Sequence, residues 1–348
     1  MWQVVGQNKA LSLLEHSLKK GTLAHAYLLV GPAHVGKKTL ALNLAQALNC
    51  EGDEPPCGEC APCRKIKSLK HADVQIIGLN QNEDSAEERN QVEISIDQIR
   101  ELQHSSNLPP FEGKCKVFII DEAELMSNEA ANCLLKTLEE PLGKVVFMLL
   151  TTNERLLPAT VISRCQRLKL LPLKASEMEK TLKSYWGIKP ERAKCLARLS
   201  HGCLGWALSA ASSESLLEER TQRIQRLLDI TGTDYEERFA YATELATQFH
   251  KNRRLVQEIL GLWLFWWRDL MLVKVGCAQS ITNVDFEATI NEIARDYGLA
   301  QIRAFISSIQ NATNELRQNA NPQLVLEVLM LSIPRKEGKV GSPAPDFG

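Results

Sequence analysis

The sequence lacks any long apolar run and any excess of charge of one sign. No stretch of the 348 residues approaches the ~20 apolar residues that cross a bilayer. The first residues show neither the basic start nor the apolar core of a signal peptide. The 41 basic and 42 acidic residues give a net charge of −1, so no general positive field favours nucleic-acid binding. We therefore expect a cytosolic protein without membrane contact, long enough for two or three domains.

Cysteine, in contrast, is abundant, with ten residues. Disulfides are rare in the cytosol, so this number favours metal ligands or free thiols. Four cysteines fall in a short segment rich in glycine and proline: Cys50, Cys57, Cys60 and Cys63. Four thiolates at this spacing can close a tetrahedral zinc site without an open position, which predicts a structural zinc. An iron–sulfur cluster and free cysteines are the alternatives.

A nucleotide-binding pattern begins at Gly31 and continues through Gly36 and Lys37. The apolar run 26–30 before it predicts a buried strand, and the pattern over 38–48 predicts a helix. In this setting, backbone N–H groups at the helix start can hold a phosphate, and Lys37 can reach the outer phosphates. A glycine-rich turn unrelated to phosphate binding is the simpler alternative.

The next position of this loop departs from the pattern. Lys38 stands where Ser or Thr would ligate magnesium, and its ammonium repels the metal. Thr39 does not replace the missing ligand, because one residue along a helix turns the side chain by roughly 100°. His34 replaces a glycine often found within the loop, so the backbone approaches a phosphate less easily. We expect weak or absent ATP and magnesium binding and little or no ATPase activity.

A second part of the same site follows downstream. The apolar run 117–120 predicts a strand that ends at Asp121 and Glu122, which suits a magnesium ligand followed by a carboxylate that polarises water. Strands also often end at charged turns, so this signal depends on the loop upstream. A further predicted strand, 145–150, leads to Asn153, which either senses the outer phosphate or caps a turn.

These patterns predict an α/β core with a parallel sheet between helices, followed by helical domains. We expect the core over 1–172 with the zinc module at 50–63, a helical lid over 173–213, an all-helical domain over 214–335 and a disordered tail over 336–348. Residues 79–90 are polar and are expected to be partly disordered. Ser95 and Gln98 form a capping-box pattern. Apolar residues at helical spacing predict one buried helix face: Leu260, Trp263, Leu264, Trp267 and Leu270.

Five segments resemble the clamp-loader ATPases of the AAA+ class. Residues 132–141 read NCLLKTLEEP, residues 163–165 read SRC, and a cysteine insertion follows the helix of the phosphate loop. Residues 5–7 resemble the family's VGQ box near adenine, and 266–270 resemble a helix of its collar domain. The resemblance extends over roughly residues 1–335.

This resemblance implies a subunit of the bacterial DNA polymerase III clamp loader, an α/β AAA+ domain with zinc insertion, helical lid and collar. Such a complex is a five-subunit ring of gamma or tau, delta and related subunits, which loads a sliding clamp onto primed DNA with ATP. Within it, Arg164 of the SRC segment would act in trans as an arginine finger on a neighbouring subunit. An ordinary salt bridge is the alternative role for Arg164.

Three departures favour a non-motor subunit over the gamma and tau motors. Lys38 alters the loop, the lid segment 202–208 has no arginine where the motors place one, and no long extension follows residue 348. The acid pair Asp121–Glu122 keeps a hydrolysing motor subunit as the alternative. A zinc-containing AAA+ regulator that binds DNA alone would need a module such as a helix-turn-helix, and none is evident.

Overall fold

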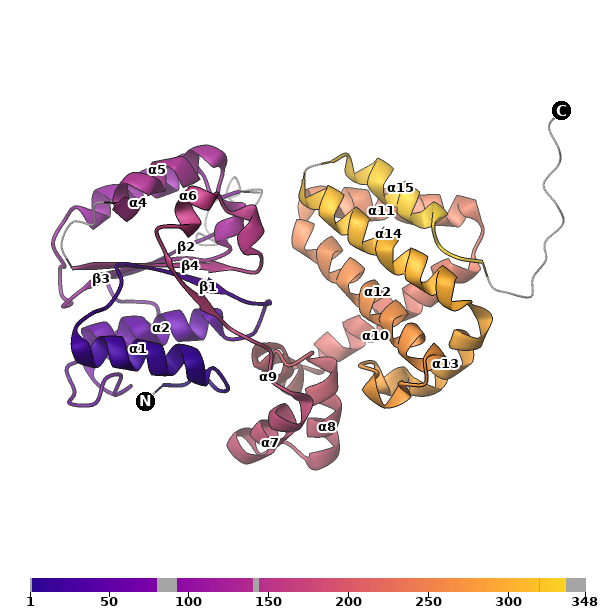
Figure 1. The fold of residues 1–348 in the computed structure, drawn as a ribbon, viewed down its shortest axis with the longest axis horizontal. Helices are drawn as coiled ribbons and strands as arrows, with labels where there is room; N and C mark the ends of the chain where they lie inside the picture. The colour runs from indigo at the N-terminus through magenta and orange to yellow at the C-terminus, as the bar shows by residue number, and fades with distance from the viewer. Residues whose placement is uncertain (1, 80–92, 140–143, 319, 336–348) are drawn as a thin grey trace. The chain divides into compact units, whose positions relative to one another are not determined.

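The computed structural model describes residues 2–79, 93–139, 144–318 and 320–335. The predicted disordered tail and all but the first residue of the predicted disordered segment 79–90 lie outside these residues. The chain divides into two compact units, which Figure 1 shows together but which we describe separately. The first comprises Met1–Lys174 and Gly202–Trp206, and the second Ala175–His201 and Ala207–Gly348.

The first unit contains a parallel sheet between two layers of helices (Figure 1). Its strands lie in the order β2-β3-β4-β1-β5 and are all parallel to their neighbours. The strand bounds are β1 Ala26–Val30, β2 Val74–Ile77, β3 Lys116–Ile120, β4 Val145–Thr151 and β5 Gln166–Lys169. The predicted α/β core, with a parallel sheet between helices, is thereby confirmed.

Helices cover both faces of this sheet, which explains why its central strands are continuously apolar. In β1, Tyr27 and Leu29 pack into the core beneath α1 and α2, whereas Leu28 faces the core beneath α4 and α5. All three side chains are fully buried. The helices of this unit are α1 Asn8–Lys20, α2 Lys37–Asn49, α3 Ala61–Lys67, α4 Ile96–Ser106, α5 Asn128–Glu139 and α6 Ala159–Ile162, with short 3-10 turns η2 Ala123–Leu125 and η3 Glu154–Leu156.

The predicted capping box at the start of α4 is present. The Gln98 N–H donates to Ser95 Oγ (3.4 Å), and the Ser95 N–H donates to Gln98 Oε1 (2.9 Å). These bonds satisfy donors that the first turn of a helix leaves unpaired. The helix start was therefore readable from local sequence.

The second unit is helical throughout its described residues. Three short helices occupy the predicted lid region, although a separate lid domain and the boundaries of the last two domains stay predictions. The helices are α7 Ala175–Trp186, α8 Pro190–Leu199, α9 Leu204–Ser212, which begins in the first unit, α10 Glu214–Gly232, α11 Tyr235–Lys251, α12 Arg253–Lys274, α13 Glu287–Ile293, α14 Leu299–Arg317 and α15 Pro322–Leu331, with 3-10 turns η4 Ala278–Ser280, η5 Val284–Phe286 and η6 Ala294–Asp296.

The core of this unit forms around α12. Trp263, Trp266 and Trp267 are at most 1% exposed, and Trp267 packs against Tyr297 and Phe305. This confirms the predicted packing face. None of the described helices combines the length and apolar character that a bilayer span requires.

Asp269, within the collar-like segment, has a structural role in this core. Its fully buried carboxylate accepts hydrogen bonds from the N–H groups of Thr282 (2.9 Å) and Asn283 (2.8 Å) and from the Asn283 side chain (2.7 Å). Burial raises the pKa of Asp269, and these hydrogen bonds oppose that rise. The Asp269 carboxylate thereby anchors to α12 the segment of chain that comes after η4.

Candidate functional site

The phosphate loop connects β1 to α2 with a conformation suited to an anion. Gly31 continues the sheet by donating its N–H to the Thr151 carbonyl at the end of β4 (3.1 Å). His34 and Gly36 have positive φ angles of 60° and 106°, and α2 begins directly after Gly36. The strand–loop–helix context predicted for this segment is therefore present.

Lys37 is turned into the loop itself. Its side chain is buried, and Nζ donates to the carbonyl oxygens of Gly31 (2.6 Å) and Pro32 (2.8 Å). Burial lowers the pKa of Lys37, while the nearby Glu124 and Asp121 carboxylates act in the opposite direction. A phosphate would have to compete with two carbonyl oxygens for this ammonium group.

Lys38 lies against the acidic strand end. Its Nζ is 3.5 Å from Oδ2 of Asp121, and both side chains are partly exposed. Asp121 Oδ1 also accepts the N–H of Glu122 (3.2 Å), whose φ is 53°. Thr39 is exposed. The structure thus brings the altered loop and the acid pair together. The ammonium group of Lys38 lies next to Asp121, the carboxylate that the sequence predicts as a magnesium ligand.

Glu124 is a site residue that the sequence interpretation did not single out. Its Oε1 accepts the N–H (2.9 Å) and the hydroxyl (2.5 Å) of Thr152, which links the turn after β3 to the end of β4. Its Oε2 is buried and has no hydrogen-bond partner among the described residues. The available signal was a third carboxylate, two positions after Glu122 and so close to the same strand end.

Asn153 caps its own turn. Its side-chain oxygen accepts the Arg155 N–H (3.1 Å), and its N–H donates to Thr151 Oγ1 (3.0 Å). This arrangement fits the capping alternative, and a phosphate-sensing role for Asn153 stays a prediction.

The start of α9 contacts the phosphate loop through a backbone hydrogen bond. The Gly205 N–H donates to the His34 carbonyl (2.9 Å). A Cβ added at Gly205 would lie 2.9 Å from that carbonyl oxygen and 3.4 Å from His34 Cβ. A larger side chain at position 205 would therefore have to displace the phosphate loop or the start of α9.

Arg164 lies away from its own phosphate loop. It precedes β5, at the amino edge of the parallel sheet, whereas the loop follows β1 at the carboxyl edge. Its guanidinium forms an ion pair with Glu139 and donates to the Thr160 carbonyl (2.9 Å). Side-chain exposure is 32% for Arg164 and 49% for Glu139. The LLKTLEEP and SRC segments are therefore in direct contact.

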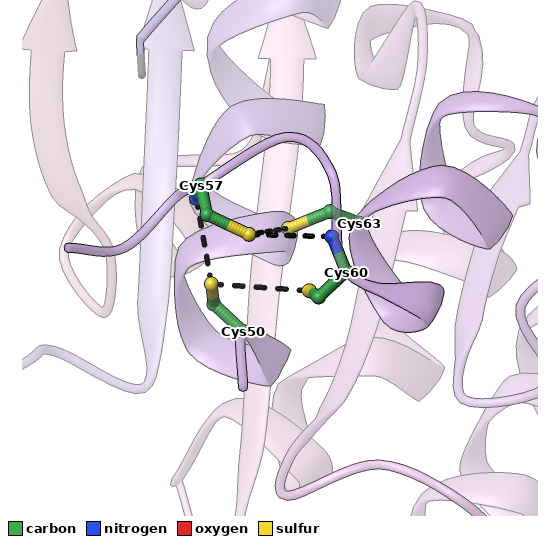
Figure 2. A group of neighbouring side chains, drawn as sticks. All are labelled: Cys50, Cys57, Cys60 and Cys63. Atoms are coloured by element: carbon green, nitrogen blue, oxygen red, sulfur yellow. Dashed lines mark hydrogen bonds between the residues drawn. The ribbon is translucent and has the colours of Figure 1, made fainter. Parts of the chain in front are cut away.

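The four clustered cysteines converge, as Figure 2 shows, from the end of α2, the loop after it and the start of α3. Their Sγ atoms all lie within 4.8 Å of one another. The Cys50–Cys60 and Cys57–Cys63 sulfur pairs are each 4.0 Å apart. Thiolates around zinc, with Zn–S near 2.3 Å in a tetrahedron, would lie about 3.8 Å apart. The arrangement could therefore bind zinc.

Backbone groups in the module are oriented toward the sulfur atoms. The N–H groups of Gly52 (3.3 Å) and Cys57 (3.4 Å) donate to Cys50 Sγ, and that of Cys60 donates to Cys57 Sγ (3.4 Å). The hydrogen bond from Cys60, with others, lowers the pKa of Cys57 to about 6, whereas burial raises the pKa of Cys63 to about 12. Such N–H donors stabilise thiolates, which is the form that binds metal.

Comparison with known families identifies the chain. Residues 6–174 match the family model described as "DNA polymerase III, delta subunit", and residues 214–334 match that described as "DNA polymerase III, delta subunit, C terminal". The chain belongs to the DNA polymerase III delta-subunit family. The resemblance to clamp-loader subunits is thereby confirmed.

Individual relatives include more than one subunit type. The chain is 28% identical to DNA polymerase III subunit delta' of Bacillus subtilis, over 94% of this chain and 96% of the relative. It is 36% identical to subunit tau of Salmonella typhimurium, over 99% of this chain but only 55% of the relative, so it spans about half of that subunit. A Thermotoga maritima gamma subunit-related structure is 18% identical, with a TM-score of 0.42, over 92% of this chain and 98% of that chain. A TM-score this low does not define a shared fold, so the assignment depends on the family models.

Proposed function

We propose that the chain is a delta-prime-type subunit of the DNA polymerase III clamp loader, with an inactive ATP site of its own and an arginine finger for a neighbour. Membership in the delta-subunit family supports a clamp-loader subunit. The relatives include both delta' and tau, so identity alone does not choose between a non-motor and a motor subunit. The choice between a non-motor and a motor subunit therefore depends on the residues around the phosphate loop.

The contact between Lys38 and Asp121 is the main observation that supports a non-motor subunit. An ammonium group 3.5 Å from this carboxylate offers a positive charge where hydrolysis needs a magnesium ion. The lid segment 202–208 also has no arginine where the motor subunits place one. Two contributions to phosphoryl transfer are thus altered together, which supports weak or absent ATPase activity.

The position of Arg164 supports action in trans. A guanidinium at the amino edge of the sheet is on the wrong side to reach a phosphate at its own loop, and it is about one-third exposed, which leaves it accessible to another subunit. In the proposed ring of five subunits, it would stabilise the charge that develops on the phosphoryl group of ATP in an adjacent gamma or tau subunit. Glu139 would orient the guanidinium.

The remaining parts of the proposal concern zinc and partners. We propose one structural zinc bound by Cys50, Cys57, Cys60 and Cys63, because a closed set of four cysteines leaves no position for substrate. Its partners would be gamma or tau and delta, and through the complex the sliding clamp and primed DNA. Since bacterial DNA replication takes place in the cytosol, we place the chain there.

One experiment tests subunit type directly. The purified chain should show negligible ATPase alone and should co-elute with the gamma or tau and delta subunits of its source during size-exclusion chromatography. The hydrolysing motor subunit is the second candidate, supported by Lys37 and the retained acid pair Asp121–Glu122. ATPase of the isolated chain at a motor rate, abolished by Lys37→Ala, would establish that candidate instead.

A further inference from the structure

Helix α2 carries three buried amide side chains among its apolar residues. They follow one another at three-residue spacing and are at most 4% exposed: Asn43, Gln46 and Asn49. A buried amide costs free energy unless its polar atoms form hydrogen bonds, so each of these residues should have a partner that the fold provides. We call the three residues the amide row, and each of them holds a different segment of the first unit.

The two ends of the amide row hold segments outside the cysteine cluster. Asn43 Oδ1 accepts the Gln3 N–H (2.7 Å), which attaches the chain before α1. Asn49 Oδ1 accepts the N–H groups of Lys114 (2.8 Å) and Cys115 (3.0 Å), which fixes the entry to β3. Both contacts have an evident role in the fold, because they satisfy backbone donors that lie outside the helices and strands.

The middle residue of the row, Gln46, contacts a cysteine of the cluster instead. Its Nε2 donates to the Cys63 carbonyl (2.8 Å), and its Oε1 accepts a hydrogen bond from Asn43 Nδ2 (3.0 Å). Cys63 Sγ in turn lies 3.9 Å from the backbone carbonyl oxygen of Gln46. Both polar atoms of the Gln46 amide are therefore paired, and both the carbonyl and the sulfur of Cys63 lie against this residue.

Cys50 and Cys63 form the inner half of the cluster. Both are buried, whereas the other two cysteines are partly exposed. The backbone carbonyl of each buried cysteine accepts a hydrogen bond from a side chain outside the module 50–63 or on α2: Lys114 Nζ donates to that of Cys50, and the Gln46 amide to the other. The two inner ligands are thus fixed to the core of the first unit independently of the contacts between the four sulfur atoms.

We propose that Gln46 is a positioning residue for the metal, which orients Cys63 so that its thiolate joins the other three in one tetrahedron. This role rests on the structural zinc proposed above, and it adds a residue outside the four ligands on which zinc affinity depends. Residues that orient a metal ligand commonly contribute roughly 10–100-fold to metal affinity. An amide suits the role, because it donates a hydrogen bond but carries no charge that competes with zinc for a thiolate.

The test compares Gln46→Met with Gln103→Met in the full-length chain. Methionine is an unbranched side chain without a donor, so it removes the hydrogen bond while it fills the space. Gln103, on α4, is the matched control, because its Nε2 likewise donates to a cysteine carbonyl, that of Cys133 (2.7 Å), outside the cluster. Competition with a chromophoric chelator measures zinc affinity. We expect Gln46→Met to weaken zinc binding by roughly 10–100-fold and Gln103→Met to leave it unchanged.

Cobalt supplies a second readout, which a general loss of stability would not change. Cobalt(II) can replace zinc in a thiolate site, and its visible absorption reports how the ligands are arranged around it. At saturating cobalt, we expect altered absorption bands in Gln46→Met and the wild-type spectrum in Gln103→Met. Gln46→Glu is a second variant in case the methionine prevents folding. It keeps the acceptor for Asn43, but a carboxylate cannot donate to the Cys63 carbonyl, so it should show the same two effects.

The outcomes separate this role of Gln46 from the zinc site itself. Wild-type zinc affinity and a wild-type cobalt spectrum in both Gln46 variants would overturn the positioning role and leave the zinc site standing. Equal losses of affinity in Gln46→Met and Gln103→Met would also overturn it, because the effect would then not depend on the cluster. A wild-type chain that binds neither zinc nor cobalt would overturn the zinc site, and the role of Gln46 with it.

Discussion

The Nζ atom of Lys38 lies 3.5 Å from Oδ2 of Asp121, so the phosphate loop and the acidic strand end are joined by an ion pair. In an active site of this class, a magnesium ion makes that connection while it also binds the nucleotide. The lysine supplies charge but has no oxygen to offer a metal. On the function proposed above, this contact would leave the α/β core intact while it withholds the metal that ATP hydrolysis needs.

Replacing Lys38 should partly restore metal-dependent binding. We expect Lys38→Thr to bind a fluorescent ATP analogue more tightly with magnesium than without it, because a hydroxyl ligand replaces a repelling charge. Lys38→Met is the matched control, since it removes the charge without adding a ligand. Loss of the partly exposed ion pair should change the free energy of unfolding by less than about 1 kcal/mol. Identical magnesium dependence in wild type and Lys38→Thr would show that the lysine does not block the metal.

Gly205 should not accept a larger side chain without a loss of stability. A side chain at this position meets the His34 carbonyl, so we expect Gly205→Ala to lower the free energy of unfolding by about 1–3 kcal/mol, a typical cost of overpacking. Gly261→Ala, where an added Cβ meets nothing within 4 Å, is the control and should not destabilise. Chemical denaturation measures both. Equal stability of the Gly205→Ala variant would mean that α9 moves away from the loop without cost.

Arg164 should matter only in the assembled complex. Arg164→Ala should leave folding and subunit incorporation intact and should lower DNA- and clamp-stimulated ATPase, because a finger removed from one site typically costs on the order of 10³-fold there. The total loss should be partial, since the other interfaces keep their own residues. Arg167→Ala is the control, because it removes an exposed arginine of β5 that forms an ion pair with Glu154. If both variants support wild-type rates, Arg164 serves as an ordinary salt bridge.

The cysteine cluster should contain about one equivalent of zinc per chain in protein purified without chelator. Cys57→Ser should reduce the bound metal and lower the melting temperature, because the module loses a ligand. Cys277→Ser, at a partly buried cysteine outside the cluster, should do neither. Elemental analysis and thermal melting are the measurements. Metal-free protein with four freely reactive cluster thiols would contradict the zinc assignment.

Asp73 should make stability depend on pH. Burial alone would raise the pKa of Asp73, but the hydrogen bonds from Phe111, Glu112 and Gly113 outweigh burial and lower it. A lowered pKa stabilises the fold above the unfolded value of about 3.9, and this contribution is lost as pH falls through the folded pKa. Asp73→Asn should cost about 1–3 kcal/mol at neutral pH. Its deficit relative to wild type should shrink in urea titrations below about pH 4, and a constant deficit would exclude this origin.

Features that depend on neighbouring residues in the sequence were predictable. The capping box needs only Ser95 and Gln98, and the buried face of α12 follows from helical spacing. The phosphate loop was also recognisable, because its glycines and Lys37 form one continuous pattern.

Contacts between distant segments were not predictable in the same way. Lys38 meets Asp121 and Arg164 meets Glu139 only because of the strand order and the helices that connect it. The role of Glu124 was missed because the glutamate pairs with Thr152, whose proximity depends on β3 and β4 being neighbours. A single sequence identified the chemical groups but not these pairs.

The contact of Arg164 with Glu139 and Thr160 has a consequence for assembly. Both partners belong to the same chain, so the rotational freedom of the arginine is restricted when the chain folds. Immobilising a side chain of this kind at an interface otherwise opposes binding by about 0.5–1.5 kcal/mol. In the proposed complex, a neighbour that docked against this edge would therefore meet an already ordered guanidinium, and association would proceed without that entropic penalty.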